Sequence, residues 1–390
     1  MYRFLEKNNY QFGDRVDIKA LKAEMPTVAA FKKMFTNDAG EMYLYQVDSF
    51  ASNEAKQHFW SALSEFNQVA HKKEVKKSAL KRKKTLGIAP TFRDLKGMPK
   101  FHSKKNHDFS YTTYNQKNNI QLNGNFLTLP TAQKSQLRNV GVALRLHRPL
   151  PADSTIKHVT VSMNAEGAFF VSLCVEFVMD ITNMDTPTRI LGLDYSQAAF
   201  FVDSEGKKAN YPLFMCQAEA RLMQEQKKLS RMVKGSNRWH KQRRLIAKLH
   251  VKIANQRKDW LHKKSHVLSK RYDLVVLEDL DLRFLSQNPF FAKKQQDNGF
   301  GNFRLYLKYK LEQQGKLFLK APKTFASTQI CSSCGFKNKE LKGIENIGKR
   351  TWTCPKCNSH HDRDKNSAKN LEQYGEYHIR KRQTAESVVS

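Results

Sequence analysis

The sequence predicts a multidomain α+β protein that binds a polyanion, and three observations carry this prediction. The chain has 390 residues, 40% of them hydrophobic, which is enough for two or three domains with cores of their own. Apolar residues follow helical spacing at first, then strand-like alternation, and later form short runs that end in an acid. Lys and Arg total 68 against 36 Asp and Glu, and a net charge of +32 favours nucleic acid as the partner.

The first part of the chain is predicted to be helical. Apolar residues recur at helical spacing from Ala55 to Phe66, after a helix cap at Ser52 or Asn53. The segment from His71 to Lys84 then carries many lysines and the single acid Glu74. A solvated helix face explains such a segment on its own. At this net charge we favour contact with phosphates.

Strand-like alternation follows from Tyr111 to Phe177, with Asn and Gly at the turns. This pattern predicts a small antiparallel β-domain, such as a barrel. A polar segment, Asp180 to Thr188, then reads as a linker. The most apolar run of the chain, Phe169 to Val178, contains Glu176 and is too short to cross a bilayer.

Two short apolar runs of the second half each end in an acid. Ile190 to Asp194 and Leu274 to Glu278 are both predicted to be strands that are buried on both faces. Between them, Arg221 to Arg271 has apolar residues at helical spacing among many Lys and Arg, with a break at Gly235. We expect a helical hairpin there, apolar on one face and strongly basic on the other.

Acids in such strands require an explanation. An unpaired ionised carboxylate among Leu, Ile and Val costs several kcal/mol or shifts its pKa, so Asp194 and Glu278 need partners. Pairing with Lys or Arg is one possibility, and a helix cap is the ordinary role for the acids of Asp362-Arg363-Asp364. Together, three such carboxylates suit two Mg²⁺ ions that hydrolyse a phosphodiester. Both explanations stay open at this point.

Two Cys-x-x-Cys pairs near the end of the chain predict a tetrahedral zinc site. Its ligands are Cys331, Cys334, Cys354 and Cys357. Four thiolates leave no position for water, so we expect one structural zinc ion. His360 and His361 follow too closely to replace a cysteine, and we expect them to contact solvent, backbone or phosphate. Only two further cysteines are present, which favours a reducing, intracellular compartment.

Five motifs, in order, resemble the RuvC-type nuclease of TnpB proteins, which are transposon-encoded, RNA-guided DNA endonucleases similar to the compact type V CRISPR effectors. The motifs are Gly192-Leu193-Asp194, Leu277-Glu278-Asp279-Leu280, Ser327-Thr328-Gln329-Ile330-Cys331-Ser332-Ser333-Cys334-Gly335, Thr351-Trp352-Thr353-Cys354-Pro355 and Asp362-Arg363-Asp364-Lys365-Asn366. The resemblance is specific from about Thr188 to Tyr374 and diffuse in the first half.

The resemblance implies catalytic, Mg²⁺-binding roles for Asp194, Glu278 and Asp364. The second aspartate of the family's final motif binds metal, so Asp364 is preferred and Asp362 is expected to be a cap or support. The four cysteines match the family's zinc-bearing target-strand loading element. Arg363 and Asn366 match motif positions with supporting roles.

The resemblance also implies a division into domains. The first half would contain a helical recognition-like domain (1–95) and a β-rich wedge-like domain (96–185). The second half would contain a RuvC-like (RNase H-like) nuclease core that includes the basic hairpin (186–320), a zinc-binding insert (321–360) and the end of the core (361–380). A disordered tail (381–390) is expected to follow.

The predicted function is that of an RNA-guided, Mg²⁺-dependent DNA endonuclease whose partners are guide RNA and target DNA. No membrane or small-molecule substrate is expected, and the expected location is the prokaryotic cytoplasm, at the nucleoid. The basic residues expected to contact nucleic acid are Lys72, Lys73, Lys76, Lys77, Lys81, Arg82, Arg231, Arg243, Arg244, Lys248 and Arg257. Two alternatives remain: a guide-independent RuvC-like nuclease or resolvase, and a zinc-ribbon nucleic-acid binder whose acids are merely salt-bridged.

Overall fold

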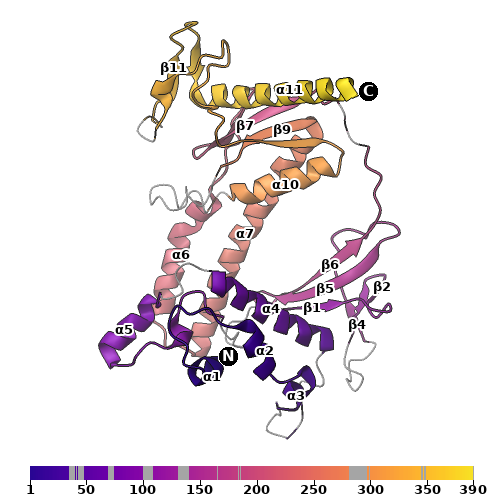
Figure 1. The fold of residues 1–390 in the computed structure, drawn as a ribbon, viewed down its shortest axis with the longest axis vertical. Helices are drawn as coiled ribbons and strands as arrows, with labels where there is room; N and C mark the ends of the chain where they lie inside the picture. The colour runs from indigo at the N-terminus through magenta and orange to yellow at the C-terminus, as the bar shows by residue number, and fades with distance from the viewer. Residues whose placement is uncertain are drawn as a thin grey trace. The chain divides into compact units, whose positions relative to one another are not determined.

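Two compact units make up the chain in the computed structural model, Met1–Val178 and Met179–Ser390. The structure describes residues 1–34, 40, 42, 48–68, 74–99, 109–130, 140–164, 166–182, 184, 186–280, 297, 299–343, 346 and 348–389. The ribbon in Figure 1 shows helices and strands in both units, so the mixed α and β composition is confirmed. The finer division into recognition, wedge, nuclease and zinc-binding parts stays a prediction.

The first unit begins with helices. They are α1 (Tyr2–Lys7), α2 (Ile18–Glu24), α3 (Val28–Lys33), α4 (Ser49–Gln68), α5 (Lys77–Leu86) and the 3-10 turn η2 (Phe92–Asp94). Leu63 and Phe66 of α4 are buried in a core that α1 and α2 complete. The predicted cap of α4 was wrong, because Asp48 Oδ1 accepts a hydrogen bond from Phe50 N (3.1 Å) and the helix begins earlier.

Strands form the rest of the first unit. One sheet has the order β1 (Phe109–Tyr114), β5 (Thr155–Met163), β6 (Phe169–Glu176), and the other has the order β2 (Gln121–Asn123), β3 (Phe126–Thr128), β4 (Gly141–Ala143). All their pairings are antiparallel, as predicted. Ile120, Leu127 and Val159 form a core shared by both sheets. The described strands form two sheets rather than one barrel, because β2, β3 and β4 are only three residues long each.

A mixed four-stranded sheet organises the second unit. Its order is β10 (Leu317–Ala321), β9 (Leu274–Glu278), β7 (Ile190–Ser196), β8 (Phe200–Asp203). Strand β9 runs parallel to both β7 and β10, whereas β8 is the antiparallel hairpin partner of β7. Both predicted acid-ended runs are therefore neighbouring strands that point the same way.

Helices cover both faces of this sheet (Figure 1). They are α7 (Asn237–Arg271) and α10 (Phe300–Glu312) on one face and α11 (Arg363–Val389) on the other, while α6 (Phe214–Ser230) packs along α7. Leu191 and Leu193 of β7 belong to the core formed with α7 and α10. Leu274 and Val276 of β9 pack instead with Leu371 of α11. Burial on both faces explains why these strands are continuously apolar.

The predicted helical hairpin is confirmed as α6 and α7. Its break lies where expected, because Gly235 has a φ of +90° and the Ser236 hydroxyl caps α7 by accepting a hydrogen bond from Trp239 N (3.1 Å). In the described part of the chain, no helix is long and apolar enough to cross a membrane.

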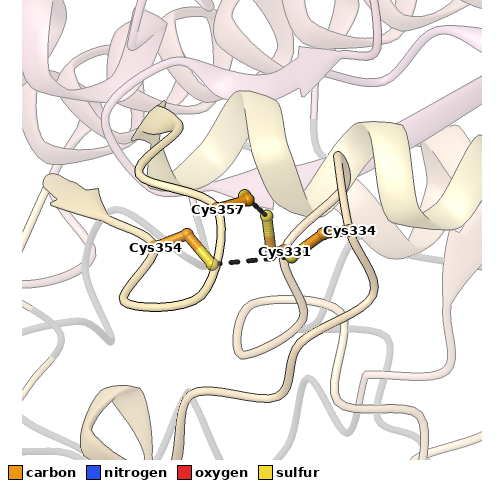
Figure 2. Close-up of side chains that lie close together, drawn as sticks. All are labelled: Cys331, Cys334, Cys354 and Cys357. Atoms are coloured by element: carbon orange, nitrogen blue, oxygen red, sulfur yellow. Dashed lines mark hydrogen bonds between the residues drawn. The ribbon is translucent and has the colours of Figure 1, made fainter.

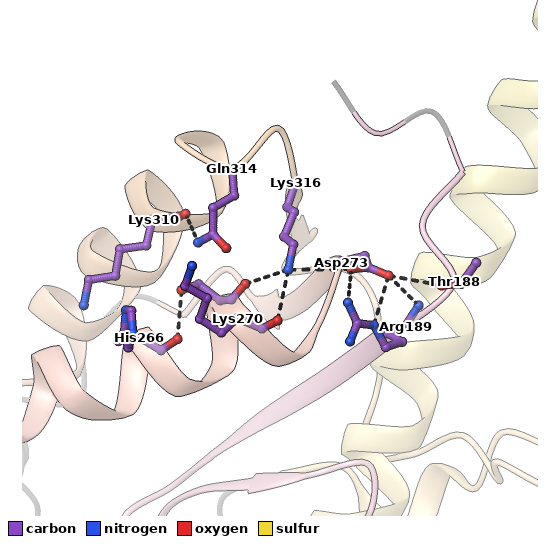
Figure 3. A network of polar contacts seen from close by, with 9 residues as sticks. Thr188, Arg189, His266, Lys270, Asp273, Lys310, Gln314 and Lys316 are labelled. Atoms are coloured by element: carbon purple, nitrogen blue, oxygen red, sulfur yellow. Dashed lines mark hydrogen bonds and ion pairs between the residues drawn. The ribbon is translucent and has the colours of Figure 1, made fainter. Parts of the chain in front are cut away.

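A buried acid fixes the edge of the sheet where the parallel strands begin. Asp273 immediately precedes β9 and is 2% exposed. Its carboxylate accepts hydrogen bonds from Arg189 (N, 3.1 Å; Nη2, 3.0 Å) and from the Thr188 hydroxyl (3.2 Å), and Lys316 Nζ lies 3.6 Å away. Figure 3 shows these side chains converging on Asp273 from the starts of β7 and β10. This network therefore ties three parallel strands together at one edge.

The last part of the chain holds small elements before a long helix. They are the 3-10 turn η4 (Lys339–Leu341) and the antiparallel pair β11 (Thr351–Thr353) and β12 (His360–Asp362), followed by α11. Helix α11 continues to Val389 and so includes most of the segment from residue 381 that was predicted to be a disordered tail. The segment after Arg380 contains neither Gly nor Pro, and nothing in it stops the helix.

Candidate active site and metal centre

The sheet register brings two of the predicted acids side by side. Leu193 pairs with Leu277 across the parallel strands β7 and β9, so Asp194 and Glu278 are the next residues along each strand. Because side chains alternate between the faces of a strand, both acids lie on the face that α11 covers. Glu278 is opposite Ala321 of β10, whose small side chain leaves room beside it.

Helix α11 brings the third acid to this edge. The helix begins at Arg363, so Asp364 lies in its first turn. A Cβ on Gly192 would lie 1.9 Å from Ala368 O, and a Cβ on Gly375 would lie 2.7 Å from Val276 Cγ2. Because Gly192 has no side chain, the backbone of α11 can approach the backbone of β7, and Gly375 of α11 leaves room for the side chain of Val276.

The environment of Asp194 is unfavourable for a negative charge. Asp194 is 6% exposed, and burial raises the pKa of its carboxyl well above the usual range. The charges of Glu278 and Asp364 raise this pKa further, whereas the hydroxyl of Ser367 and the charge of Arg363 lower it. Ser367, one turn after Asp364, contacts Asp194 (3.0 Å), so the first turn of α11 lies at the edge where β7 and β9 end. A cation at this position would relieve the repulsion.

Glu278 shares this unfavourable environment. Burial raises the pKa of its carboxyl, and a hydrogen bond from the Ser327 hydroxyl opposes the change. Asp364 is less enclosed, with a side chain that is 21% exposed and lies 3.6 Å from Arg350 Nη1.

The two aspartates of the final motif have different roles. Asp362 Oδ1 accepts a hydrogen bond from Lys365 N (2.9 Å), which is the geometry of an N-cap. Asp364 is the second residue of the helix, and its charge raises the pKa of the Asp194 carboxyl. The prediction that Asp362 is the cap is confirmed.

The four predicted cysteines form one cluster. Figure 2 shows their side chains converging from two loops, and their sulfurs all lie within 4.8 Å of one another. Cys331 Sγ is 3.7 Å from Cys357 Sγ, and Cys334 Sγ is 3.6 Å from Cys354 Sγ. Four thiol ligands at this spacing are compatible with a structural zinc site. Within the described residues no other group of three potential ligands is as close, so the three acids lie further apart than these sulfurs.

His361 corrects one expectation. Its Nε2 lies 3.1 Å from Cys331 Sγ, and its ring packs 5.0 Å from that of Trp352, so its partner is a cysteine rather than solvent, backbone or phosphate. The error arose because spacing along the chain was used to exclude His361, whereas strand β12 folds it back onto the first cysteine pair. His360 Nδ1 contacts the Thr353 hydroxyl (3.2 Å).

Buried amides join the cysteine cluster to α11. Asn366 Nδ2 donates to Ile330 O (2.6 Å), and Asn366 Oδ1 accepts from Ser332 N (2.9 Å). Asn370, one turn later, donates from Nδ2 to Ser327 O (2.7 Å) and to Ile330 O (2.6 Å). The helix that carries Asp364 therefore holds the loop that enters the cysteine cluster.

Arg363 also holds the insert that contains the cysteines. It is 8% exposed, and its guanidinium donates to Asn346 O and Leu341 O, which belong to that insert. The supporting role expected for Arg363 is therefore to anchor backbone carbonyls. Asn366 supports the site in the same way, through the backbone of the cysteine loop.

A pocket of about 820 Å³ opens beside Glu278. Its lining combines residues after β9, the segment from Pro322 to Gln329, and three lysines of the insert. These lysines are Lys337, Lys339 and Lys342. An acid from the predicted site and several cations thus border one cavity, which suits an anionic chain.

The basic residues predicted to contact nucleic acid have different environments. Lys77, Lys81, Arg231, Arg244 and Lys248 are exposed. Arg82 pairs with Asp94 (2.8 Å), Lys76 donates to Arg93 O, and Arg243 lies over the Trp239 ring (5.6 Å). Lys72 and Lys73 lie outside the described residues.

Arg257 forms an ion pair with a buried acid. Its side chain is 26% exposed, and Nη2 pairs with Oδ1 of the buried Asp297 (3.2 Å). Asp297 also accepts from Met215 N, at the start of α6 (3.1 Å). A guanidinium held in this way joins α7 to the start of α6, whereas the predicted phosphate contact of Arg257 stays a prediction.

Ser327, Ser367 and Asn370 belong to the site, and the sequence analysis did not assign them a role. Ser367 donates to Asp194, Ser327 donates to Glu278, and Asn370 holds the backbone of Ser327. Ser327 opens the third quoted motif, and Ser367 and Asn370 follow the fifth. Their position beside the motifs was the one available signal.

Comparison with protein families locates the similarity in the second unit. The OrfB_IS605 family model, described as "Probable transposase", matches residues 172–288, and the model "Cas12f1-like, TNB domain" matches residues 300–371. The two matches follow one another along the chain and include all four cysteines and the three predicted acids.

Individual relatives are similar to little more than half of the chain. The chain is 35% identical over 228 residues to the "Putative RNA-guided DNA endonuclease" of Streptomyces pristinaespiralis. This alignment covers 58% of this chain and 55% of that protein. It is 28% identical over 243 residues to the "Putative RNA-guided DNA endonuclease InsQ" of Escherichia coli K12. This alignment covers 58% of this chain and 59% of that protein. The chain thus matches little more than half the length of these relatives.

A third relative carries the family name itself. The TnpB-like protein L79 of Acanthamoeba polyphaga mimivirus is 28% identical over 146 residues, which covers 36% of this chain and 27% of that protein. Among solved structures, a Cas12f1-sgRNA-target DNA complex aligns with 95% of this chain and 78% of its own, at 14% identity and a TM-score of 0.44, a similarity too low to support an inference. The two family models and the named relatives agree with the resemblance carried by the five motifs, and the second unit of the chain is similar to TnpB-like proteins and to putative RNA-guided DNA endonucleases.

Proposed function

We propose that this protein is an RNA-guided DNA endonuclease whose second unit is a RuvC-like core. One observation supports the proposal: Asp194 and Glu278 end neighbouring parallel strands, and Ser367, one turn after Asp364 in α11, contacts Asp194 (3.0 Å) at that same edge. A structural salt bridge is a poor explanation for Asp194, because burial and two neighbouring acids all raise its pKa. Such a group of acids suits cations.

The three carboxylates would hold two Mg²⁺ ions. Bound Mg²⁺ would neutralise charge on the phosphate and activate a water for phosphodiester hydrolysis. Asp194 and Glu278, on rigid neighbouring strands, would provide the fixed ligands. Asp364, at the first turn of α11, would provide the third, and its greater exposure leaves space for the substrate.

The pocket beside Glu278 would receive the strand to be cut. Its lysines from the insert would contact phosphates of that strand. The cysteine cluster, holding one zinc ion, would keep the insert folded so that these lysines face the acids. Elemental analysis of the purified chain should give one zinc per chain, and a chain that folds and cleaves with no bound metal at the cysteines would contradict this role.

Guide RNA and target DNA are proposed as the partners. The printed names of the relatives from Streptomyces pristinaespiralis and Escherichia coli describe RNA-guided DNA endonucleases. The net charge of +32 supplies the attraction for both nucleic acids. In effectors of this kind base pairing provides sequence recognition, and the protein binds the backbone.

A cleavage assay tests the proposal. The chain, incubated with RNA transcribed from its own transposon end and a matched DNA target, should cut the DNA only when Mg²⁺ is present. Asp194→Ala should reduce cutting to background, while RNA and DNA binding persist. Asp259→Asn is the matched control, because Asp259 is a surface acid of the same unit with a side chain that is 61% exposed.

Two outcomes would overturn parts of the proposal. Equal cutting without RNA would leave a guide-independent nuclease. Full activity of Asp194→Ala would exclude the acidic site as the catalytic centre.

A further inference from the structure

Two fully buried hydroxyls lie between the acids of the two strands. Ser367 is 0% exposed and Ser327 is 1% exposed. Ser367 Oγ is 3.0 Å from Asp194 Oδ1 and 2.9 Å from Ser327 Oγ, and Ser327 in turn donates to Glu278 Oε1. The four side chains thus form a continuous polar bridge from β7 to β9.

The number of hydrogens fixes the direction of these contacts. A serine hydroxyl has one hydrogen to donate, and an ionised carboxylate only accepts. When both carboxylates are ionised, the two hydroxyl hydrogens go to the acids, so Ser367 donates to Asp194 and Ser327 donates to Glu278. The 2.9 Å contact between the two Oγ atoms then has no hydrogen of its own. Each serine then occupies one oxygen of its acid and leaves the other oxygen, Oδ2 or Oε2, for a cation.

The bridge is held from outside the acids. Ser367 is three residues after Asp364 and lies on the same side of α11. Ser327 has its carbonyl oxygen bound by Asn370 Nδ2 (2.7 Å), and Asn370 is a residue of the same helix. One rigid helix therefore carries Asp364, supplies the hydroxyl to Asp194, and holds the serine that contacts Glu278.

Buried serines in other helices of this unit behave differently. Ser265 and Ser269 of α7 are also 0% exposed, and their hydroxyls donate to carbonyls of their own helix, Leu261 O (2.8 Å) and His266 O (3.0 Å). This local bond is the ordinary way to satisfy a helical serine. Ser367 reaches instead to a carboxylate on another element, which indicates a role in the site.

We propose that Ser367 and Ser327 are positioning residues that select which oxygen of Asp194 and Glu278 faces the catalytic cations. This inference rests on the proposed two-metal function. Partners that orient metal ligands affect metal affinity about 10- to 100-fold. Losing a hydroxyl would let the carboxylate rotate, so the loss should appear first in cation affinity and only secondarily in the rate at saturating cation.

The test measures Mn²⁺ binding to the purified full chain, by the loss of the free-ion resonance signal, together with the Mg²⁺ dependence of guided cleavage. Ser367→Ala should weaken Mn²⁺ binding and raise the Mg²⁺ concentration for half-maximal cleavage about 10-fold, with much of the rate restored by excess Mg²⁺. Ser327→Ala should do the same through Glu278. Ser269→Ala is the matched control and should match the unmodified chain in both measurements.

The outcomes separate this inference from the function on which it rests. If the unmodified chain and Asp194→Ala bind Mn²⁺ equally, the acidic site holds no cation and the proposed function fails. If Asp194→Ala loses binding but Ser367→Ala and Ser327→Ala bind Mn²⁺ like the unmodified chain, the positioning role is overturned alone. Should one serine variant fail to fold, the other gives the result, because each serine contacts a different acid.

Discussion

The charges of individual residues differ sharply between the two edges of the sheet in the second unit. At the edge where the parallel strands begin, Asp273 has cationic partners. Burial raises the pKa of its carboxyl, but the hydrogen bonds and charge of Arg189 outweigh burial and hold this pKa at about 2. At the opposite edge, Asp194 and Glu278 have each other for neighbours, and both have raised pKa values. One edge therefore pairs its buried acid with cations, whereas the other places two buried acids side by side, which is where we propose that cations bind.

Asp273→Asn should lower the free energy of unfolding of the second unit by about 2 kcal/mol at pH 7, since one pKa unit corresponds to 1.36 kcal/mol. The folded-state pKa of about 2 is below the ordinary value of 3.8. The stabilisation is therefore complete above about pH 4 and is lost as the pH falls towards 2. Urea titrations of the full chain should show a difference between the two proteins that roughly halves at pH 3.

The control for this prediction is Asp259→Asn, which removes a surface ion pair with Lys263 and should change stability by less than about 0.5 kcal/mol. A loss from Asp273→Asn that is the same at pH 3 and pH 7 would mean that shape, not charge, explains the role of Asp273.

A site residue could be predicted only where its residue type is unusual among its neighbours in the sequence. Asp194 and Glu278 were identifiable because each ends a run of Leu, Ile and Val where an acid is costly. Ser367 and Ser327 were not, because a serine costs little anywhere and its partner is set only by the packing of α11. His361 was misassigned for a related reason: chain spacing does not show how β12 folds back on Cys331.

At the scale of elements, the packing of α11 on β7 decides whether the site can form. The strands and helices of this unit were predictable, because buried runs and helical stripes mark them clearly. The distance between α11 and β7 could not be predicted, because it depends on a single glycine, and one glycine produces no periodic pattern in the sequence. At Gly192, a Cβ would lie 1.9 Å from Ala368 O and 2.6 Å from Glu372 N. Both are backbone atoms of α11, so the side chains cannot yield to make room.

Gly192→Ala should therefore push α11 away from β7. We expect a loss of about 1–3 kcal/mol in stability, typical of overpacking, and a larger fall in cleavage because Asp364 and Ser367 move together with the helix. Thermal unfolding and the cleavage assay measure the two effects. Gly348→Ala is the matched control, because its Cβ would meet no atom within 4 Å. Unchanged stability and cleavage in Gly192→Ala would show that the close approach is unimportant.

At the scale of the whole molecule, the excess of cations is the property that the sequence predicted most directly, and its placement is what required the structure. Several candidate cations are exposed to solvent, such as Arg244 and Lys248 on α7, whereas Arg257 on the same helix forms an ion pair with Asp297. Composition cannot distinguish these cases, because both kinds of residue count equally towards +32. In the first unit, alternation predicted strands but not their division into two sheets, which depends on short strands and turns.

The exposed cations of α7 should contribute to nucleic-acid affinity through counterion release. Removing Arg244 and Lys248 together, as Arg244→Gln with Lys248→Gln, should reduce the slope of log affinity against log salt concentration by about 1.5–2, because each phosphate contact contributes about 0.7–0.9. Filter binding of guide RNA or duplex DNA at several salt concentrations gives the slope. The matched control is Lys263→Gln with Lys308→Gln, which removes the same charge from lysines that already lie one turn from Asp259 and Glu312. Because those lysines are locally neutralised, the control slope should change by less than about half as much. Equal changes in both double variants would mean that overall charge, rather than the exposed face of α7, determines binding.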